Sequence, residues 1–189
     1  PVGGLLRTAR ATLRVPVRLA IDNDFFCKLG RCEALSMFLE CMGVSASDSY
    51  VLDALPHQLR APAEGKKAPR LRRAHEAHAD GLYTLSQTFR KIDGTNLDPR
   101  NLDTFNAIPG IDPGEAILFA FAVENHDVVI ATGDKRALRE LATIPLANEA
   151  LKNRIVCVES ALRHLSEKHG VPQFREHGKT IGGCDNAIK

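Results

Sequence analysis

The chain has 189 residues, of which 44% are hydrophobic and 25% charged, a balance that excludes a wholly disordered protein and fits one globular domain. The formal net charge of +2 is close to neutral, so affinity for nucleic acid would have to come from a local group of basic residues. The longest apolar run, residues 116–123, is too short to span a membrane.

The cysteines predict a reducing, cytoplasmic location. There are five of them, scattered and without C-x-x-C spacing, so neither a disulfide framework nor a zinc site is expected. They are Cys27, Cys32, Cys41, Cys157 and Cys184.

The N-terminal part of the chain leads into a first strand. The first 21 residues hold four arginines and no acid, which fits either a transit peptide or a plain extension. We favour an extension over residues 1–14, because serine is absent and an alternating apolar strand follows at residues 15–21. A helix over residues 24–43 comes next, since apolar residues recur at steps of three and four until Gly43.

The middle of the chain gives weaker signals. Val51, Leu52 and Leu55 predict a short helix that Pro56 ends or restarts, after a turn-rich segment at 45–49. An exposed loop is expected over residues 61–69, and a long helix with one apolar face over residues 71–91. Residues 93–110 are polar and are expected to form a loop with a short helical turn.

Strands and helices alternate clearly in the C-terminal part. The expected elements are a helix over residues 116–124, a strand over 128–132, a helix over 135–142, a strand over 154–158 and a helix over 160–169. The tail, residues 173–189, has no assignable structure. Apolar strands that alternate with helices predict an α/β domain over residues 15–172, with a parallel sheet covered on both faces.

Two of the predicted strands end on a carboxylate. The first runs into Asp22, and the strand over residues 128–132 runs into Gly133 and Asp134. Ligands of such sheets bind beyond the C-terminal ends of the strands, where the strand order reverses. We therefore expect Asp22 and Asp134 to lie at one edge of the sheet.

A carboxylate cluster of this kind is suited to a hard cation such as Mg²⁺, which takes oxygen ligands. Glu115, at the start of a predicted helix, completes the expected set with Asp22 and Asp134, and Asp24 is a possible fourth acid. Each acid also has a purely structural interpretation, because Asp at a helix start caps the helix and Asp112-Pro113-Gly114-Glu115 has the pattern of a capping box. The three acids together favour the metal site.

The chain resembles the PIN-domain nuclease family. The resemblance rests on Ile21-Asp22-Asn23-Asp24, on Ile111-Asp112-Pro113-Gly114-Glu115-Ala116 and on Thr132-Gly133-Asp134-Lys135-Arg136, and it covers about residues 17–165. It implies a three-layer α/β/α sandwich with a parallel sheet of four or five strands. It also implies that Asp22, Glu115 and Asp134 bind Mg²⁺ or Mn²⁺ for the hydrolysis of RNA or DNA strands.

One departure from the family pattern concerns a further acid. The family usually carries it early in a helix some 30–40 residues after the first Asp, and Asp53 is the acid nearest to that place here. On a helix, Asp53 would share a face with Pro56 and His57 rather than with a clear site. Without that ligand the site would be reduced and its catalysis weak or absent.

Basic residues form a candidate surface for nucleic acid. Lys66, Lys67, Arg70, Arg72 and Arg73 put five cations into eight residues, and His75 and His78 follow. A solvated loop and helix start is the competing interpretation, since no aromatic residue is interleaved.

Four further charged residues have a weaker claim. Lys135 and Arg136 could hold a substrate phosphate or balance the acids beside them. Glu159 closes a predicted strand but is expected to cap a helix, and Asp185 lies in the unassigned tail.

The sequence thus predicts a metal-dependent endonuclease that cuts RNA rather than DNA. One alternative is a PIN-fold nucleic-acid-binding protein with a reduced site. Another is a phosphatase with Asp22 as nucleophile and Asp24 as acid, although Phe26 stands where that chemistry usually has Thr. The resemblance further suggests a homodimer, and the roles of a toxin with an antitoxin partner, an RNA-processing factor and a mobile-element protein are all compatible with it.

Overall fold

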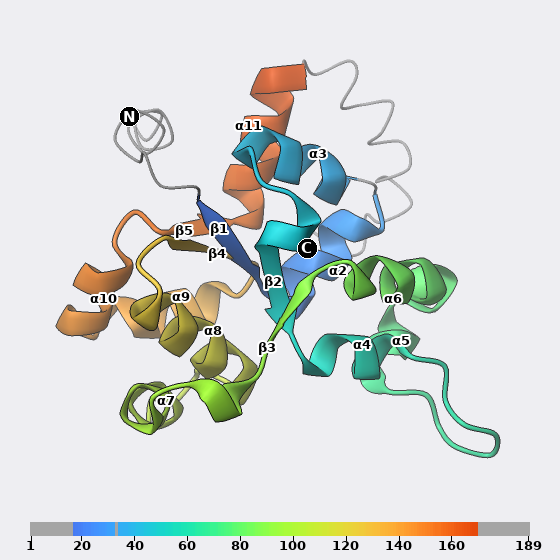
Figure 1. Ribbon diagram of the computed structural model, residues 1–189, viewed down its shortest axis with the longest axis horizontal. Helices are drawn as coiled ribbons and strands as arrows, with labels where there is room; N and C mark the ends of the chain where they lie inside the picture. The colour runs from blue at the N-terminus through green and yellow to red at the C-terminus, as the bar shows by residue number, and fades with distance from the viewer. Residues whose placement is uncertain (1–16, 33, 170–189) are drawn as a thin grey trace.

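A five-stranded, all-parallel sheet lies at the centre of the computed structural model, which describes residues 17–32 and 34–169 (Figure 1). The strands are β1 (Arg18–Ile21), β2 (Ser49–Leu52), β3 (Arg90–Ile92), β4 (Val128–Thr132) and β5 (Ile155–Cys157). Their order is β3-β2-β1-β4-β5. The prediction of a parallel sheet of four to five strands is confirmed, whereas the extension 1–14 and the tail 173–189 lie outside the described residues.

The side on which the chain adds strands to the sheet changes at β1. From β1 the chain builds outward through β2 to β3, and it then returns to place β4 on the other side of β1. Ile21 at the end of β1 pairs with Val51 of β2 and with Ala131 of β4. The N–H of Asp22 continues this pairing and donates to the carbonyl of Ala131 at 2.9 Å. The end of β1 is therefore the switch point of the sheet.

Helices cover both faces of the sheet, which confirms the three-layer α/β/α architecture (Figure 1). Leu19 and Ile21 of β1 point to one face and Ala20 to the other, as the period of a strand requires. The first face packs on α2 (Asn23–Gly30), α3 (Ala34–Met42), α4 (Ala54–Leu59), α6 (Ala79–Gln87) and α11 (Val158–His169). The second packs on α7 (Pro99–Asn106), α8 (Pro113–Glu124), α9 (Lys135–Ala142) and α10 (Pro145–Leu151).

The largest errors of the sequence prediction fall between residues 23 and 59. The single helix expected over residues 24–43 is two helices, α2 and α3. The short helix expected from Val51 onward is wrong, because Ser49–Leu52 is the buried strand β2 and the helix α4 begins only after Asp53. Val51 and Leu55 both reach the core, so the spacing that suggested a helix comes from two elements packed on one face.

The region from residue 70 to 110 also differs from the expectation. The long helix over residues 71–91 is wrong, since the chain forms α5 (Arg70–Ala74), the 3-10 turn Glu76–His78, α6 and then the strand β3. In the loop expected over residues 93–110 lies the eight-residue helix α7, capped by Asp98 with Pro99 at its first position. The helix α10 was not predicted either.

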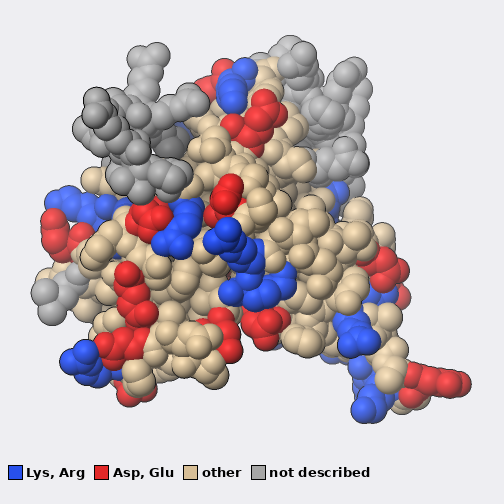
Figure 2. All heavy atoms as spheres, in the orientation of Figure 1, with Lys and Arg blue, Asp and Glu red and all other residues tan. Residues whose placement is uncertain are grey.

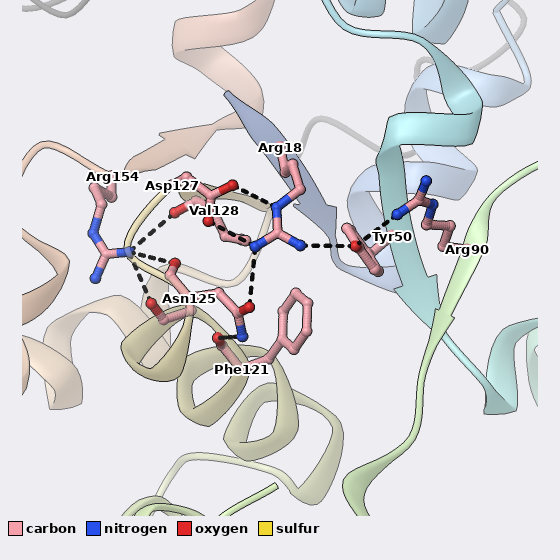
Figure 3. A network of polar contacts seen from close by, with 9 residues as sticks. Arg18, Tyr50, Arg90, Phe121, Asn125, Asp127, Val128 and Arg154 are labelled. Atoms are coloured by element: carbon pink, nitrogen blue, oxygen red, sulfur yellow. Dashed lines mark hydrogen bonds and ion pairs between the residues drawn. The ribbon is translucent and has the colours of Figure 1, made fainter. Parts of the chain in front are cut away.

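The N-terminal ends of the strands are held by a polar network (Figure 3). The Arg18 guanidinium donates to both carboxylate oxygens of Asp127, at 2.5 and 2.7 Å, and to the Tyr50 hydroxyl at 2.9 Å. Arg90 donates to the same hydroxyl at 3.3 Å. Charge-assisted, bidentate bonds of this kind fix geometry as well as adding stability. The network therefore fastens β1, β2, β3 and the start of β4 at the edge opposite to Asp22.

Arg154, just before β5, anchors three segments to one another (Figure 3). Its Nη1 donates to the carbonyls of Ala122, Asn125 and Val128 at 2.8, 3.0 and 3.2 Å, and its Nε donates to Ala150 at 3.0 Å. Ala122 lies in α8 and Asn125 directly follows it, Val128 begins β4, and Ala150 lies in α10. One half-buried cation thus satisfies backbone acceptors that would otherwise lose their partners.

Replacing Arg154 with Met is expected to lower the free energy of unfolding by about 2 kcal/mol, since the apolar stem is kept and the bonds to carbonyls are lost. Urea denaturation followed by circular dichroism measures this loss. Arg163→Met is the matched control, because Arg163 is exposed and pairs with the exposed Glu167 on α11 at 3.1 Å, and this change should alter stability by less than about 0.5 kcal/mol. Equal losses in the two variants would contradict the anchoring role.

Candidate active site

A cleft of about 1290 Å³ opens beyond the C-terminal ends of the strands. Figure 1 shows α8 on one side of the sheet and α4 and α5 on the other, and residues of all three helices or of the turns beside them line the cleft. Asp22, Glu115 and Asp134 all line this cleft, although they come from the end of β1, the first turn of α8 and the start of α9. The structure therefore brings together the three acids that the sequence singled out.

Asp22 is held in the cleft by its backbone rather than by a helix cap. It occupies the N-cap position of α2, but its side chain makes no capping hydrogen bond there. The side chain is only 9% exposed. Burial, together with the negative charge of Asp24, raises the pKa of Asp22 to about 6, while the N–H groups of Asn23 and Gly133 act in the opposite direction. Capping thus does not explain why an acid is buried here.

Glu115 and Asp112 form the capping box that the sequence predicted. The N–H of Glu115 donates to Oδ1 of Asp112 at 2.9 Å, and the N–H of Asp112 donates to Oε2 of Glu115 at 2.8 Å. The box uses only one oxygen of the Glu115 carboxylate. Glu115 is only 4% exposed and lines the cleft. Capping and a role in the site are compatible for this residue.

Asp134 likewise caps a helix with one oxygen. Its Oδ1 accepts from the N–H groups of Arg136 and Ala137 at 2.7 and 3.1 Å, which starts α9. Its own N–H donates to the hydroxyl of Thr132 at 3.1 Å, so the turn after β4 is rigid. Oδ2 lies 3.6 Å from the Arg136 guanidinium. The helix cap therefore does not use this oxygen.

Glu115 and Asp134 are electrostatically coupled. Their carboxyl groups lie close enough to share a hydrogen bond. Burial and the nearby charges of Asp112 and Asp134 raise the pKa of Glu115 to about 7. Burial also acts to raise the pKa of Asp134, but the N–H groups of Ala137 and Arg136, the hydrogen bond with Glu115 and the charge of Arg136 together lower that pKa. Near pH 7 about half of the Glu115 carboxyl groups therefore carry a proton.

Asp24 lies beside this group but is already paired. Its Oδ2 is 2.6 Å from Nζ of Lys28, one turn later on α2. The same oxygen lies against Gly133, where any Cβ would approach it to 2.5 Å. A side chain at this position would therefore displace the Asp24 carboxylate from its place beside the turn after β4. Asp24 acts on the site mainly through its charge, which raises the pKa of Asp22 after the larger effect of burial.

Asp53 lies at the same sheet edge, contrary to the position expected on a helix face. It follows β2 directly, precedes α4 and lines the cleft with an exposed side chain. Two acids not considered as site residues, Asp93 after β3 and Asp112, line it as well. The signal in the sequence that could have identified Asp53 and Asp93 is the short strand that directly precedes each of them. Four acids besides Asp22, Glu115 and Asp134 therefore surround the cleft: Asp24, Asp53, Asp93 and Asp112.

The basic residues divide into two groups. Arg70, Lys135 and Arg136 line the cleft, whereas Lys66 and Lys67 lie in the exposed loop between α4 and α5, which extends from the body in Figure 1. Lys135 forms an ion pair with Glu159 at the start of α11, and neither residue of the pair is buried.

Arg72, from the same basic run, donates to the carbonyl of Leu59 at 2.6 Å and to Asp80 at 2.8 Å. It is therefore occupied within the fold. Figure 2 shows basic and acidic side chains mixed on the visible face, without a broad basic patch. Asp185 lies outside the described residues.

The chemistry of these donors fits a hard divalent cation. Carboxylates are the oxygen ligands that Mg²⁺ and Mn²⁺ prefer. Burial, with the negative charges of neighbouring acids, raises the pKa values of Asp22 and Glu115, and a bound cation would act in the opposite direction. Within residues 17–32 and 34–169, no three His, Cys, Asp or Glu side chains converge around one point. Which acids would bind the ion therefore stays a prediction, with Asp22, Glu115 and Asp134 as the expected ligands.

Two neutral polar side chains that line the cleft, Asn23 and Gln58, were missed by the sequence analysis. His75, which follows the predicted basic run, lines the same side of the cleft. Comparison of the chain with family models, with curated proteins and with solved structures found no match. The resemblance to PIN-domain nucleases accordingly rests on the sequence motifs, and the fold it implies agrees with the observed three layers.

Proposed function

We propose that this protein is a metal-dependent endonuclease of PIN type that hydrolyses phosphodiester bonds of single-stranded RNA. One observation carries the proposal: Asp22, Glu115 and Asp134, from three separate elements, line one cleft at the switch point of a parallel sheet. A helix cap explains one oxygen of Glu115 and one of Asp134, and it explains neither oxygen of Asp22. The preference for RNA over DNA comes from the resemblance alone.

The residues of the cleft have separable roles. Asp22, Glu115 and Asp134 would hold Mg²⁺ or Mn²⁺, which supplies a water nucleophile of lowered pKa and positive charge beside the scissile phosphate. Because its pKa is raised to about 7, Glu115 is about half protonated near pH 7 in the absence of a cation, so cation binding would release protons. Arg70, Lys135 and Arg136 line the cleft. Their positive charges would counter the negative charge of the seven acids that line it when a phosphodiester enters.

The test is cleavage of a fluorescently labelled single-stranded RNA of mixed sequence by the full chain. We expect cleavage in Mn²⁺ or Mg²⁺, none after addition of EDTA, and slower cleavage of DNA of the same sequence. Calorimetric titration with Mn²⁺ in parallel should show binding that Glu115→Gln abolishes. A chain that binds Mn²⁺ but cuts no RNA would be the binding protein with a reduced site, and a chain that does neither would overturn the proposal.

The phosphatase alternative finds no support in the site. Its acid, Asp24, would have to carry a proton, yet it pairs with Lys28. Phe26, where that chemistry usually has Thr, is fully buried in the core. The argument for a reduced site is also weaker, since Asp53 lines the cleft.

The partners other than RNA stay predictions, namely a homodimer and an antitoxin. Among the helices that the structure describes, none has the length and apolar character to cross a membrane. A cytoplasmic location likewise stays a prediction.

A further inference from the structure

We propose that residues 60–73, named the basic arm below, bind the phosphate backbone of a single nucleic-acid strand that also enters the cleft. The inference rests on the proposed function and deepens it, because the preferred substrate then is an extended strand rather than a short oligonucleotide. Five exposed cations of the basic arm carry it, since none has an acidic partner among the described residues: Arg60, Lys66, Lys67, Arg70 and Arg73.

The surroundings of these cations differ from those of other exposed cations. Arg100, Lys152 and Arg163 each form an ion pair with a neighbouring acid. The basic arm contains a single acid, Glu64, and this residue forms no ion pair within the part of the chain that the structure describes. Unpaired cations that lie close together repel one another, so a bound polyanion would stabilise this segment.

The basic arm is fixed to the fold at its base. Arg72 donates to the carbonyl of Leu59 at 2.6 Å, which ties α5 to the end of α4. In the middle of the loop, the N–H of Lys66 donates to the carbonyl of Ala63 at 3.0 Å, and Gly65 supplies the positive φ of 75° that this turn uses. The loop extends from the body in Figure 1, and basic side chains lie on the same projection at the lower right of Figure 2.

The basic arm is continuous with the cleft. Arg70 begins α5 and lines the cleft, and Lys66 and Lys67 precede it by four and three residues. Because an extended chain spans at most about 3.5 Å per residue, the backbone of Lys66 lies within about 14 Å of that of Arg70. Binding sites for single strands cover about 4–16 nucleotides, so one strand can contact both places. This continuity favours a nucleic-acid strand over a membrane surface as the partner of the basic arm.

The cleft by itself is poorly suited to attract a polyanion. Seven acids line it, and its cations besides Arg70 are Lys135 and Arg136, which already pair with Glu159 and Asp134. The attraction for a strand would therefore come from outside the cleft. The basic arm is the group of unpaired cations that adjoins it.

Contacts of the basic arm would not distinguish one base from another. Residues 60–73 contain no aromatic side chain on which a base could stack. Contacts from lysine and arginine to phosphates carry no sequence information, and each contact to a single strand adds about 0.7 to the slope of log K against log salt concentration. The expected binding is independent of sequence and is weakened by salt.

Fluorescence anisotropy with a labelled RNA of sixteen nucleotides tests the proposal, in EDTA so that binding is measured without cleavage. Lys66→Ser combined with Lys67→Ser should weaken binding by at least about tenfold at 0.1 M salt and lower the salt slope by about 1.4. Glu64→Lys adds a cation to the same loop and should strengthen binding about fivefold, a gain that a folding defect does not produce. In Mn²⁺, the double variant should reduce kcat/KM for the sixteen-nucleotide RNA about tenfold and leave kcat/KM for a trinucleotide unchanged.

Lys152→Ser combined with Lys168→Ser is the matched control. It makes the same change in net charge at exposed lysines outside the basic arm and the cleft, so it should alter binding by less than about twofold. Equal losses in the two double variants would contradict the proposal, and so would no RNA binding by the unmodified chain. Adsorption of the chain to phosphatidylserine vesicles that the RNA does not release would assign the basic arm to a membrane instead and overturn the proposal.

This inference and the proposed function can fail separately. A chain that cuts RNA, with cleavage and binding unaffected by changes in the basic arm, would overturn the inference alone. A chain that loses RNA binding on substitution of Lys66 and Lys67, and that cuts no RNA in Mn²⁺ or Mg²⁺, would keep the strand contact and remove the nuclease activity.

Discussion

Asp134→Asn is expected to reduce Mn²⁺-dependent RNA cleavage by at least about 100-fold, because the substitution removes the charge of a proposed cation ligand. The fold should survive it. Asparagine is as good an N-cap as aspartate, and its side-chain oxygen can still accept from the N–H groups of Arg136 and Ala137 that start α9. We therefore expect the free energy of unfolding to change by less than about 1 kcal/mol.

A second helix cap provides the matched control for this experiment. Asp98 caps α7 by accepting from the N–H of Arg100, and it does not line the cleft. Asp98→Asn therefore makes the same chemical change at the same kind of position and should leave cleavage unchanged. Cleavage rates measured on the labelled RNA, with thermal denaturation of each variant, distinguish the two. Unchanged cleavage in Asp134→Asn would remove Asp134 from the site.

Glu115→Gln is expected to stabilise the cation-free protein by about 3 kcal/mol at pH 8. Burial raises the pKa of Glu115 from 4.5 to about 7, so the folded protein binds a proton more tightly than the unfolded chain does. The contribution of Glu115 to stability therefore falls as the pH rises from about 4.5 to about 7, and it is lowest above that range. Glutamine does not ionise, and its amide can donate to Asp134 in place of the shared proton.

The difference between Glu115→Gln and the unmodified chain should shrink to about 1 kcal/mol at pH 5, where the folded carboxyl is protonated in any case. Urea denaturation in EDTA at pH 5 and pH 8 measures both values. Glu149→Gln, an exposed acid on α10 outside the cleft, should show no such pH dependence. An equal effect of Glu115→Gln at both pH values would mean that folding does not raise the pKa of Glu115. We expect the Glu115→Gln variant to be more stable and inactive, because a residue that serves function can lower the stability of the fold.

The sequence was most informative where an element is buried on all sides. β4 is five residues of continuous apolar character ended by Thr132, and α8 is apolar around its whole circumference, so both were predicted close to their observed bounds. β2 and β3 have only four and three residues, too few to show alternation, and pairing with β1 and with each other makes them strands. The residues of β2 or β3 alone do not reveal this pairing with distant strands.

The same limit explains the candidate site. Asp22 and Asp134 follow strands that could be recognised, and Glu115 belongs to a capping box with a clear pattern, so all three were identified. The sequence prediction put Asp53 on a helix because it took the strand β2 for part of a helix. It did not consider Asp93, because it merged β3 into the long helix expected over residues 71–91. Asn23 and His75 carry no motif. The hydrogen bond from Asn23 to Gln58 joins α2 to α4, and α5 packs on α4, so long-range contacts bring both residues to the cleft.

The strand order has a consequence for synthesis of the chain. β1 is the central strand, and the neighbour on its second edge is β4, which pairs Arg18 with Val128. A chain that grows from its N-terminus can complete β1, β2 and β3 while that second edge has no partner. Long-range pairing of this kind is slow, and an uncovered edge strand pairs readily with other chains. A ribosome that stalls before residue 128 would thus release a product with β1 exposed and prone to aggregate.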